Sequence, residues 1–329
     1  MAKLHLSLAV GDYDRNRPLV DGAVQIDGVT PVTMTLSPEE MFFRAMRHEA
    51  FDITELSLSS YTLRVARGDC PYIGIPAFVS RAFRHTSIIV RSAAGIETPA
   101  DLVGRRVGIA EWQLTANVWA RALLEEQGVG LADVTWVRGG IEEAGRIEKI
   151  GVTPPAGVVI EDIGPGRTLK EMLAQGEIDA FVGPRLPTSF TPDNPDLRWL
   201  FDDPIAAASA YYARTRIFPI MHLIGIRRPL VEAHPWLPMA VLKAFEASKA
   251  MALQQLSDPS ASKVTLPFVE EQLARARQLL GADFWPYGFD DNRHTLDYFL
   301  DQHHRQGISG RRLAPEDLFH ASTLERYKL

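Results

Sequence analysis

The hydrophobic and polar positions of the chain alternate between short apolar runs and longer segments with helical spacing. Apolar runs at 4–10, 51–56 and 72–79 predict strands. Ser37 and Pro38, followed by two acidic residues, predict a helix start, because serine caps free N–H groups and proline fits the first turn. Strands that alternate with helices in this way predict an α/β fold with a largely parallel sheet.

A second series of strands and helices follows a β-branched crossing segment at 85–91, and another crossing strand at 220–226 contains His222. The two crossings predict that lobe 1 holds both chain ends, as 1–90 and 224–329, and that lobe 2 is inserted as 91–223. The pattern also predicts strands at 106–110, 134–137 and 178–182, helices at 116–127, 169–175, 237–256, 268–280 and 293–306, a helical end at 313–329, and surface loops at 151–166 and 184–195.

The composition is that of an ordinary globular protein. Its 35 Lys and Arg against 41 Asp and Glu leave a formal charge of −6, which argues against a nucleic-acid partner. The single cysteine, Cys70, excludes an intrachain disulfide framework. No apolar run reaches the roughly 20 residues that span a bilayer, so no membrane insertion is expected. The first ten residues are typical of a strand and not of a signal peptide. We therefore expect a cytoplasmic protein, with a homo-oligomer as one alternative.

Several motifs are missing from the sequence. It has no Gly-x-Gly-x-x-Gly after a strand, no Gly-x-Ser-x-Gly and no His-Glu-x-x-His. Their absence argues against a dinucleotide site, a hydrolase nucleophile and a zinc protease site. His303 and His304 are adjacent in an expected helix and face different directions, so we interpret them as solvated surface.

Residues with useful chemistry follow the expected strands. In open α/β folds, ligands bind beyond the carboxyl ends of strands, where loops and helix N-termini meet. The arginines, hydroxyls and rings found there suit a small anionic, aromatic ligand. The candidates are Asp12, Tyr13, Ser57, Ser59, Arg81 or Arg84, His85, Glu111, Trp112, Thr115, Arg185 and His222. Structural alternatives are helix caps for Asp12, Ser57 and Ser59, a satisfied buried histidine for His222, core packing for Trp112 and a helix-dipole contact for Glu111.

Four motifs carry a resemblance to a known family. They are Ser80-Arg81-Ala82-Phe83-Arg84-His85, the segment 107–116, Pro219-Ile220-Met221-His222, and Phe284-Trp285-Pro286-Tyr287-Gly288 with Asn292-Arg293. Over nearly the whole chain, the sequence resembles proteins of the type II periplasmic-binding-protein fold, and more closely the 4,5-dihydroxyphthalate decarboxylases. The resemblance implies two lobes, each with a mixed, mostly parallel sheet flanked by helices, and a ligand cleft between them.

The same resemblance implies loss of carbon dioxide from an aromatic ortho-dicarboxylate with adjacent hydroxyls. This reaction needs a base near the para hydroxyl and an acid near the ring carbon. His85 and His222 are the candidates because imidazole titrates near neutrality, and Glu111 joins them. Arg84 and Arg185, one from each lobe, are expected to hold the retained carboxylate. The residues implied to position the hydroxyls are Tyr13, Ser57, Ser59, Glu111 and Thr115. No organic cofactor is expected, and a divalent metal stays open although no ligand cluster is recognised.

Two other functions are compatible with this fold. One is a solute-binding protein of an ABC-type transporter, which would present a small carboxylate or aromatic compound without catalysis. The other is an enzyme of a different class on the same scaffold. Fold alone does not decide among them.

Overall fold

The computed structural model describes residues 3–146, 148, 150–260 and 262–325, and the chain divides into two compact units. Unit 1 contains the chain through Arg81, then Ile220–Asp297, then the chain from Leu313; unit 2 contains Ala82–Pro219 and Tyr298–Arg312. These boundaries differ from the expected lobes. Residues 82–90 belong to unit 2 because β5 pairs with strands of that unit, and 298–312 belong to it through contacts such as the stacking of Tyr298 on Trp119.

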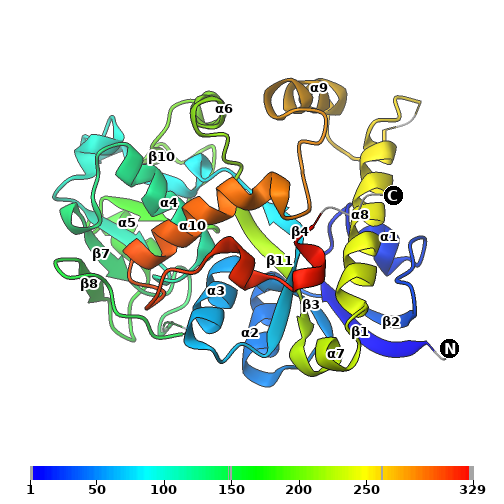
Figure 1. The fold of residues 1–329 in the computed structure, drawn as a ribbon. Coiled ribbons are helices and arrows are strands. Elements are labelled where there is room, and N and C mark those ends of the chain that lie inside the picture. The colour runs from blue at the N-terminus through cyan, green and yellow to red at the C-terminus, as the bar shows by residue number, and fades with distance from the viewer. Residues whose placement is uncertain (1–2, 147, 149, 261, 326–329) are drawn as a thin grey trace. The chain divides into compact units, whose positions relative to one another are not determined.

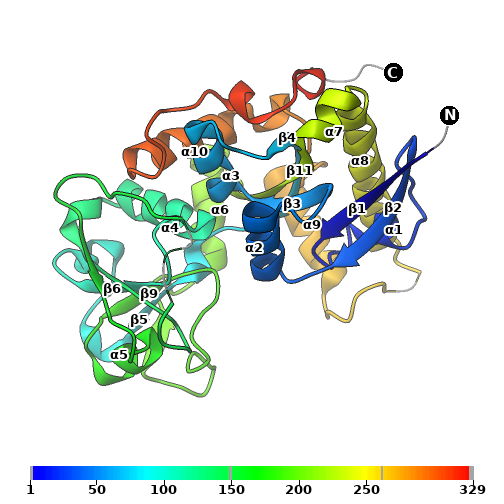
Figure 2. The same cartoon turned by 90° about the horizontal axis from the view of Figure 1, so that it is seen from below.

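Unit 1 is built on a mixed sheet with the strand order β2-β1-β3-β11-β4. Strands β1, β2 and β3 are parallel, and β11 runs antiparallel to β3 and β4. Helices flank this sheet (Figures 1 and 2). The strands are β1 (Leu4–Val10), β2 (Val29–Thr35), β3 (Ile53–Ser57), β4 (Tyr72–Arg81) and β11 (Ile220–Arg227). The helices are α1 (Arg17–Val20), α2 (Pro38–His48), α3 (Leu58–Arg67), α7 (Arg228–Ala233), α8 (Leu237–Leu256) and α9 (Val269–Leu280).

Unit 2 contains a mixed sheet with the order β10-β5-β9-β6-β7-β8, in which β9, β6, β7 and β8 are parallel. Its strands are β5 (Ile88–Arg91), β6 (Arg106–Ile109), β7 (Thr135–Arg138), β8 (Val159–Asp162), β9 (Ala180–Val182) and β10 (Leu197–Trp199). Its helices are α4 (Thr115–Glu126), α5 (Leu169–Gln175) and α6 (Pro204–Thr215). Helix α10 (Arg293–Arg305) begins in unit 1 and ends in unit 2.

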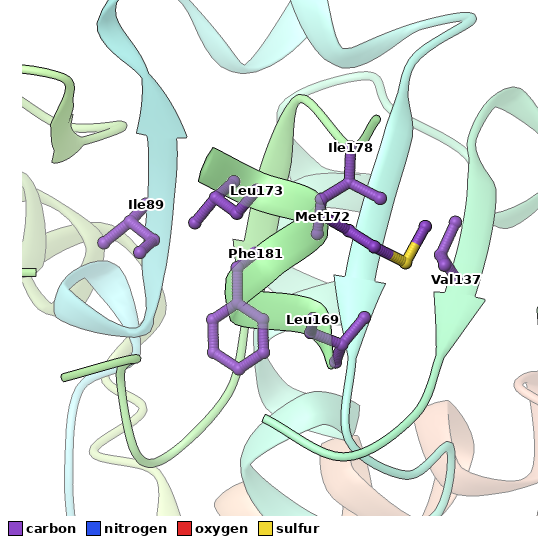
Figure 3. Close-up of a cluster of buried hydrophobic side chains, with 7 residues drawn as sticks. All are labelled: Ile89, Val137, Leu169, Met172, Leu173, Ile178 and Phe181. Atoms are coloured by element: carbon purple, nitrogen blue, oxygen red, sulfur yellow. The ribbon is translucent and has the colours of Figure 1, made fainter. Parts of the chain in front are cut away.

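The core of unit 2 shows how the sequence specifies an element. Thr168 and Glu171 form a capping box at the start of α5, and Gly176 ends the helix with a φ of 76°. Leu169, Met172 and Leu173 of this helix pack on buried strand residues that include Phe181 (Figure 3). Local caps and an apolar face therefore position α5 against the sheet.

Several expectations from the sequence need correction. The end of the chain forms 3-10 turns at Pro315–Leu318 and Ala321–Thr323 and not a longer helix, and the rest of the expected helix lies outside the described residues. The expected loop 151–166 contains strand β8, which pairs with β7, and residues 85–87 form a 3-10 turn before β5. His303 is buried against the ring of Phe299, because α10 packs inside unit 2, so its interpretation as solvated surface is wrong.

Among the helices that the structure describes, none is both long and apolar enough to cross a membrane. The cytoplasmic location stays a prediction.

Candidate functional site

Polar side chains of unit 1 meet where β1 and β3 end. Because these strands are parallel, their carboxyl ends lie at the same edge of the sheet. Strand β11 runs the other way, so His222 near its start pairs opposite Ser57 at the end of β3. The topology thus brings the turn after β1, the end of β3 and His222 together.

Glu55 is the centre of this cluster. It lies within β3, its side chain is 0% exposed, and its oxygens accept three hydrogen bonds. Oε2 accepts from the Gly11 N–H at 2.9 Å, and Oε1 accepts from the Tyr13 hydroxyl at 3.0 Å and lies 2.6 Å from Nδ1 of His222. A buried carboxylate needs such donors, because losing water without replacement costs several kcal/mol.

His222 is placed by an irregular part of the sheet. The register between β11 and β4 shifts on both sides of His222, between Ile220 and His222 and again between His222 and Ile224. Bulges of this kind re-aim a side chain and are common beside active sites. The imidazole is 17% exposed and contacts the Phe42 ring edge-on, at 4.8 Å between centroids. The imidazole is therefore held on one side by Glu55 and is still partly accessible to solvent.

The contact with Glu55 decides which nitrogen of His222 can react. A carboxylate that accepts from Nδ1 requires the proton to be there, which leaves Nε2 as a proton acceptor. The carboxylate also stabilises the imidazolium that forms, as the acid of a catalytic triad does. The pair has the geometry of a general base with its orienting group.

Tyr13 covers the other side of the carboxylate. Burial raises the pKa of Tyr13, and the neighbouring Glu55 charge raises it further, so the phenol stays protonated and donates. A Cβ at Gly11 would lie 2.4 Å from the Tyr13 ring, so only glycine leaves room for this ring. The structure brings the predicted residues Tyr13 and His222 together through Glu55, which the sequence interpretation missed.

The other predicted residues of unit 1 lie apart from this hydrogen-bonded group or deeper in the fold. Asp12 is exposed and forms an ion pair with Arg17 at 2.6 Å, and the cap position of α1 belongs to Asn16. Ser57 stands at the cap position of α3 without a side-chain cap hydrogen bond, and Ser59 is fully buried in the first turn. Only Ser57, opposite His222, borders the cluster.

His85 in unit 2 has very different surroundings. Its side chain is 3% exposed, and it contacts the rings of Phe201 and Tyr211 at 5.0 and 5.6 Å between centroids. Burial, reinforced by the charge of Arg214, lowers the pKa of His85 to about 4. Nδ1 has no hydrogen-bond partner in the described parts of the chain. The imidazole is therefore neutral at pH 7.

Arg84 and Arg185 both lie in unit 2, so the expectation of one arginine from each lobe is wrong. The reason is that the segment carrying Arg84 leads into β5, a strand of unit 2. Arg84 donates to the Ser87 hydroxyl at 3.3 Å, and burial lowers its pKa to about 10, which leaves it charged at pH 7. Arg185 is exposed after β9.

In the segment before α4, the side chains of Glu111 and Trp112 are buried and bind other residues of unit 2. Glu111 is fully buried and accepts two hydrogen bonds from Arg146, at 3.0 and 2.6 Å. Trp112 is also fully buried: its indole donates to the Gln306 carbonyl at 2.9 Å, and the Arg121 guanidinium lies 3.8 Å from its ring centroid. These contacts support structural roles for both residues instead of the expected catalytic and substrate contacts. Thr115, the first residue of α4, is buried too.

The sequence alone does not decide whether the protein binds a divalent metal. Within the ranges that the structure describes, no group of three or more His, Cys, Asp or Glu side chains could hold a metal ion. A requirement for a metal in the reaction stays untested by this observation.

Comparison with known proteins gives the family. The chain is 56% identical, over 330 residues and the full length of both proteins, to the 4,5-dihydroxyphthalate decarboxylase of Comamonas testosteroni. The chain belongs to the 4,5-dihydroxyphthalate decarboxylase family. A second 4,5-dihydroxyphthalate decarboxylase, from Pseudomonas putida, is 58% identical over 213 residues, which cover 64% of this chain and 83% of that protein. The resemblance seen in the sequence is confirmed.

The fold of this decarboxylase-family chain is confirmed as well. Residues 62–149 match the NMT1/THI5-like family. The periplasmic aliphatic sulphonate binding protein SsuA of Escherichia coli aligns with 100% of the chain and 96% of its own, at a TM-score of 0.54 and 14% identity. An identity this low shows the fold alone: a type II periplasmic-binding-protein-like fold with mixed, mostly parallel sheets.

One signal in the sequence could have pointed to Glu55. It lies in the short segment Ile53-Thr54-Glu55-Leu56, within a strand whose residues are all buried. Acidic residues are almost never fully buried unless they are paired. A glutamate in such a strand therefore predicts a buried partner, although not its identity.

Proposed function

We propose that this protein is a carboxy-lyase that converts 4,5-dihydroxyphthalate to a dihydroxybenzoate and carbon dioxide without oxidation. The observation that carries the proposal is the 56% identity over the full length of a 4,5-dihydroxyphthalate decarboxylase. An identity this high across both units supports the same substrate class, a small aromatic dicarboxylate.

The chemistry of the reaction defines what the site must supply. The bond between the ring carbon and the departing carboxylate breaks, and its electron pair stays on the ring carbon. That carbon takes up one proton, and carbon dioxide leaves. A deprotonated para hydroxyl supplies electrons to the ring carbon, so a base beside this hydroxyl lowers the barrier.

His222 is the proposed base. Its Nδ1 lies 2.6 Å from the Glu55 carboxylate, which supports Nε2 as the atom that takes the hydroxyl proton. Glu55 is the proposed positioning residue, because it orients the ring and offsets the positive charge that develops on it. Tyr13 completes the group by donating to the same carboxylate oxygen at 3.0 Å.

Unit 2 contributes the remaining proposed residues. Arg84 and Arg185 are proposed to attract the negatively charged substrate. His85 is the second proposed residue for proton transfer. Because its pKa is about 4, it acts as an acid only when a negatively charged ligand beside it raises that pKa.

The decisive test is turnover. Purified protein with 4,5-dihydroxyphthalate is expected to release carbon dioxide and to accumulate a dihydroxybenzoate in equal amounts, in a buffer free of added cofactors. His222→Gln serves as the matched inactive variant. Saturable binding of 4,5-dihydroxyphthalate without any product would overturn the proposal and favour a solute-binding protein.

A further inference from the structure

The segment Trp285–Tyr287 of unit 1 is assembled around two arginines. Trp285 contacts Arg15, and the carbonyl of Pro286 accepts a hydrogen bond from Arg81 at 2.8 Å. Arg15 comes from the turn after β1, the same turn that carries Tyr13 to Glu55. The arrangement thus places positive charge beside the proposed base.

The guanidinium of Arg15 lies against two aromatic rings. Its guanidinium carbon lies 4.4 Å from the ring centroids of both Tyr13 and Trp285. Nε donates to the Val79 carbonyl at 2.6 Å, and Nη1 lies 3.2 Å from the exposed Asp14 carboxylate. Its side chain is 18% exposed. Stacking on two rings pre-orients the guanidinium, so little freedom is lost when it binds an anion.

The second arginine fixes the segment. Arg81 is buried and donates to the Asn292 side-chain oxygen as well as to Pro286. The Asn292 amide in turn donates to the carbonyls of Pro286 at 3.1 Å and Gly288 at 2.8 Å. This network holds the backbone on both sides of Tyr287, so the position of its ring is defined.

Tyr287 supplies a second, independent observation. It is 5% exposed, and its hydroxyl is buried without a hydrogen-bond partner in the described chain. A buried hydroxyl without a partner destabilises the fold, and native structures contain few such groups. Burial raises the pKa of Tyr287, and the charges of Arg15 and Arg81 act against this rise. The phenol therefore stays a donor that lies within electrostatic reach of both arginines.

We propose that Arg15 and Tyr287 bind the carboxylate that the aromatic substrate retains. This inference rests on the proposed function and deepens it. The Tyr13 ring contacts Arg15 with its face and Glu55 with its hydroxyl, so the cation and the base assembly are one side chain apart. In the substrate, a hydroxyl and a carboxylate are likewise separated by a benzene ring. Tyr13 and Trp285 flank the cation with aromatic surface, which suits a planar, aromatic anion.

The test compares the binding of a charged and a neutral ring by calorimetry. Phthalate carries the two carboxylates without the hydroxyls and cannot follow the para-hydroxyl route, whereas catechol carries only the hydroxyls. Arg15→Gln is expected to weaken phthalate binding by about 10–100-fold, the range of a charge-assisted hydrogen bond, and catechol binding by less than about twofold. Arg15→Lys should recover part of the loss, because charge returns without the planar fork.

Tyr287→Phe tests the hydroxyl without removing the ring. We expect it to weaken phthalate binding by about 3–10-fold and to leave catechol binding within about twofold. Arg17→Gln is the matched control. It removes an exposed arginine two positions further along the chain, at the start of α1, and phthalate binding should stay within about twofold.

Each outcome separates this inference from the proposed function. Equal losses for phthalate and catechol in Arg15→Gln would show that Arg15 only supports the fold and would overturn the inference. Unchanged phthalate binding in both Arg15→Gln and Tyr287→Phe would also overturn it, even if the wild-type protein releases carbon dioxide. The variants could lose phthalate binding selectively while the wild-type protein releases no carbon dioxide. That result would support the inference and overturn the decarboxylase proposal.

Discussion

The two histidines that the sequence singles out lie in opposite kinds of environment. His222 in unit 1 is hydrogen-bonded to a buried carboxylate and keeps 17% of its surface exposed. His85 in unit 2 is enclosed by aromatic rings, is 3% exposed, and has a pKa of about 4. The same side chain is therefore hydrogen-bonded to a carboxylate and partly exposed in one unit, and enclosed and kept neutral in the other. The difference comes from the neighbours and not from the residue type.

The contrast extends to other polar residues that follow strands in the two units. In unit 1, Tyr13 and His222 converge on one carboxylate at the edge of the sheet. In unit 2, Glu111 and Trp112 are fully buried and satisfied by Arg146 and Gln306. Polar residues that follow a strand can thus either form a reactive cluster or anchor the next helix. Four substitutions test this difference between the two units, and they are taken in order from the largest expected effect to the smallest.

Glu55→Gln should have the largest effect. If the amide oxygen accepts from Tyr13 and from Nδ1 of His222, its NH2 group faces the Gly11 N–H, and the neutral amide no longer stabilises an imidazolium. We expect kcat for 4,5-dihydroxyphthalate to fall by about 10²–10³-fold, with KM within about threefold. Steady-state carbon dioxide release checks this, with Glu40→Gln, an exposed glutamate paired with Arg44, as the control. A kcat within about threefold of wild type would remove Glu55 from the mechanism.

Trp112→Phe should act on stability and not on the substrate. The change removes the hydrogen bond to Gln306 and part of the stacking surface of Arg121 from a fully buried site. The free energy of unfolding in denaturant should fall by about 2–3 kcal/mol while KM stays unchanged. Trp236→Phe, at an exposed position, should change the free energy of unfolding by less than about 0.5 kcal/mol. An altered KM with unchanged stability would restore Trp112 as a substrate contact.

The elements that the sequence predicted well are those with local signals. Residues 169–175 form a helix as expected, because Thr168 caps its start and Gly176 ends it. Helix α8 covers the expected 237–256. Helix α6 escaped prediction although Asp203 caps it and Pro204 occupies its first position. Signals that act within a few residues are thus readable, even where one was overlooked.

The candidate site could be predicted only in part, because its defining contact joins distant residues. Glu55 and His222 are separated by 167 positions and meet because β11 pairs with β3. A strand order of β3-β11-β4 cannot be obtained from local pattern, and neither can the bulges beside His222. For the same reason the burial of His303, which depends on where α10 packs, was missed.

The pH dependence of stability tests directly whether His85 is held neutral. The pKa of His85 is lowered from its ordinary 6.5 to about 4, so between these values the unfolded chain binds more protons than the folded one. Folded-state stability therefore falls as pH drops below about 6.5. We expect wild type to lose about 2 kcal/mol more than His85→Leu between pH 7 and pH 5, measured by denaturant unfolding at each pH. Equal losses in both proteins would mean that His85 is not held neutral.

Arg185→Ala should have the smallest effect and sharpens the comparison of the two units. Arg185 is exposed, so water screens its attraction for a carboxylate, and losing it should weaken phthalate binding by only about two- to fivefold. Catechol binding should not change, and Arg167→Ala, at another exposed arginine of unit 2, serves as the control. If Arg185→Ala instead weakened phthalate binding more than Arg15→Gln does, unit 2 would supply the main carboxylate contact.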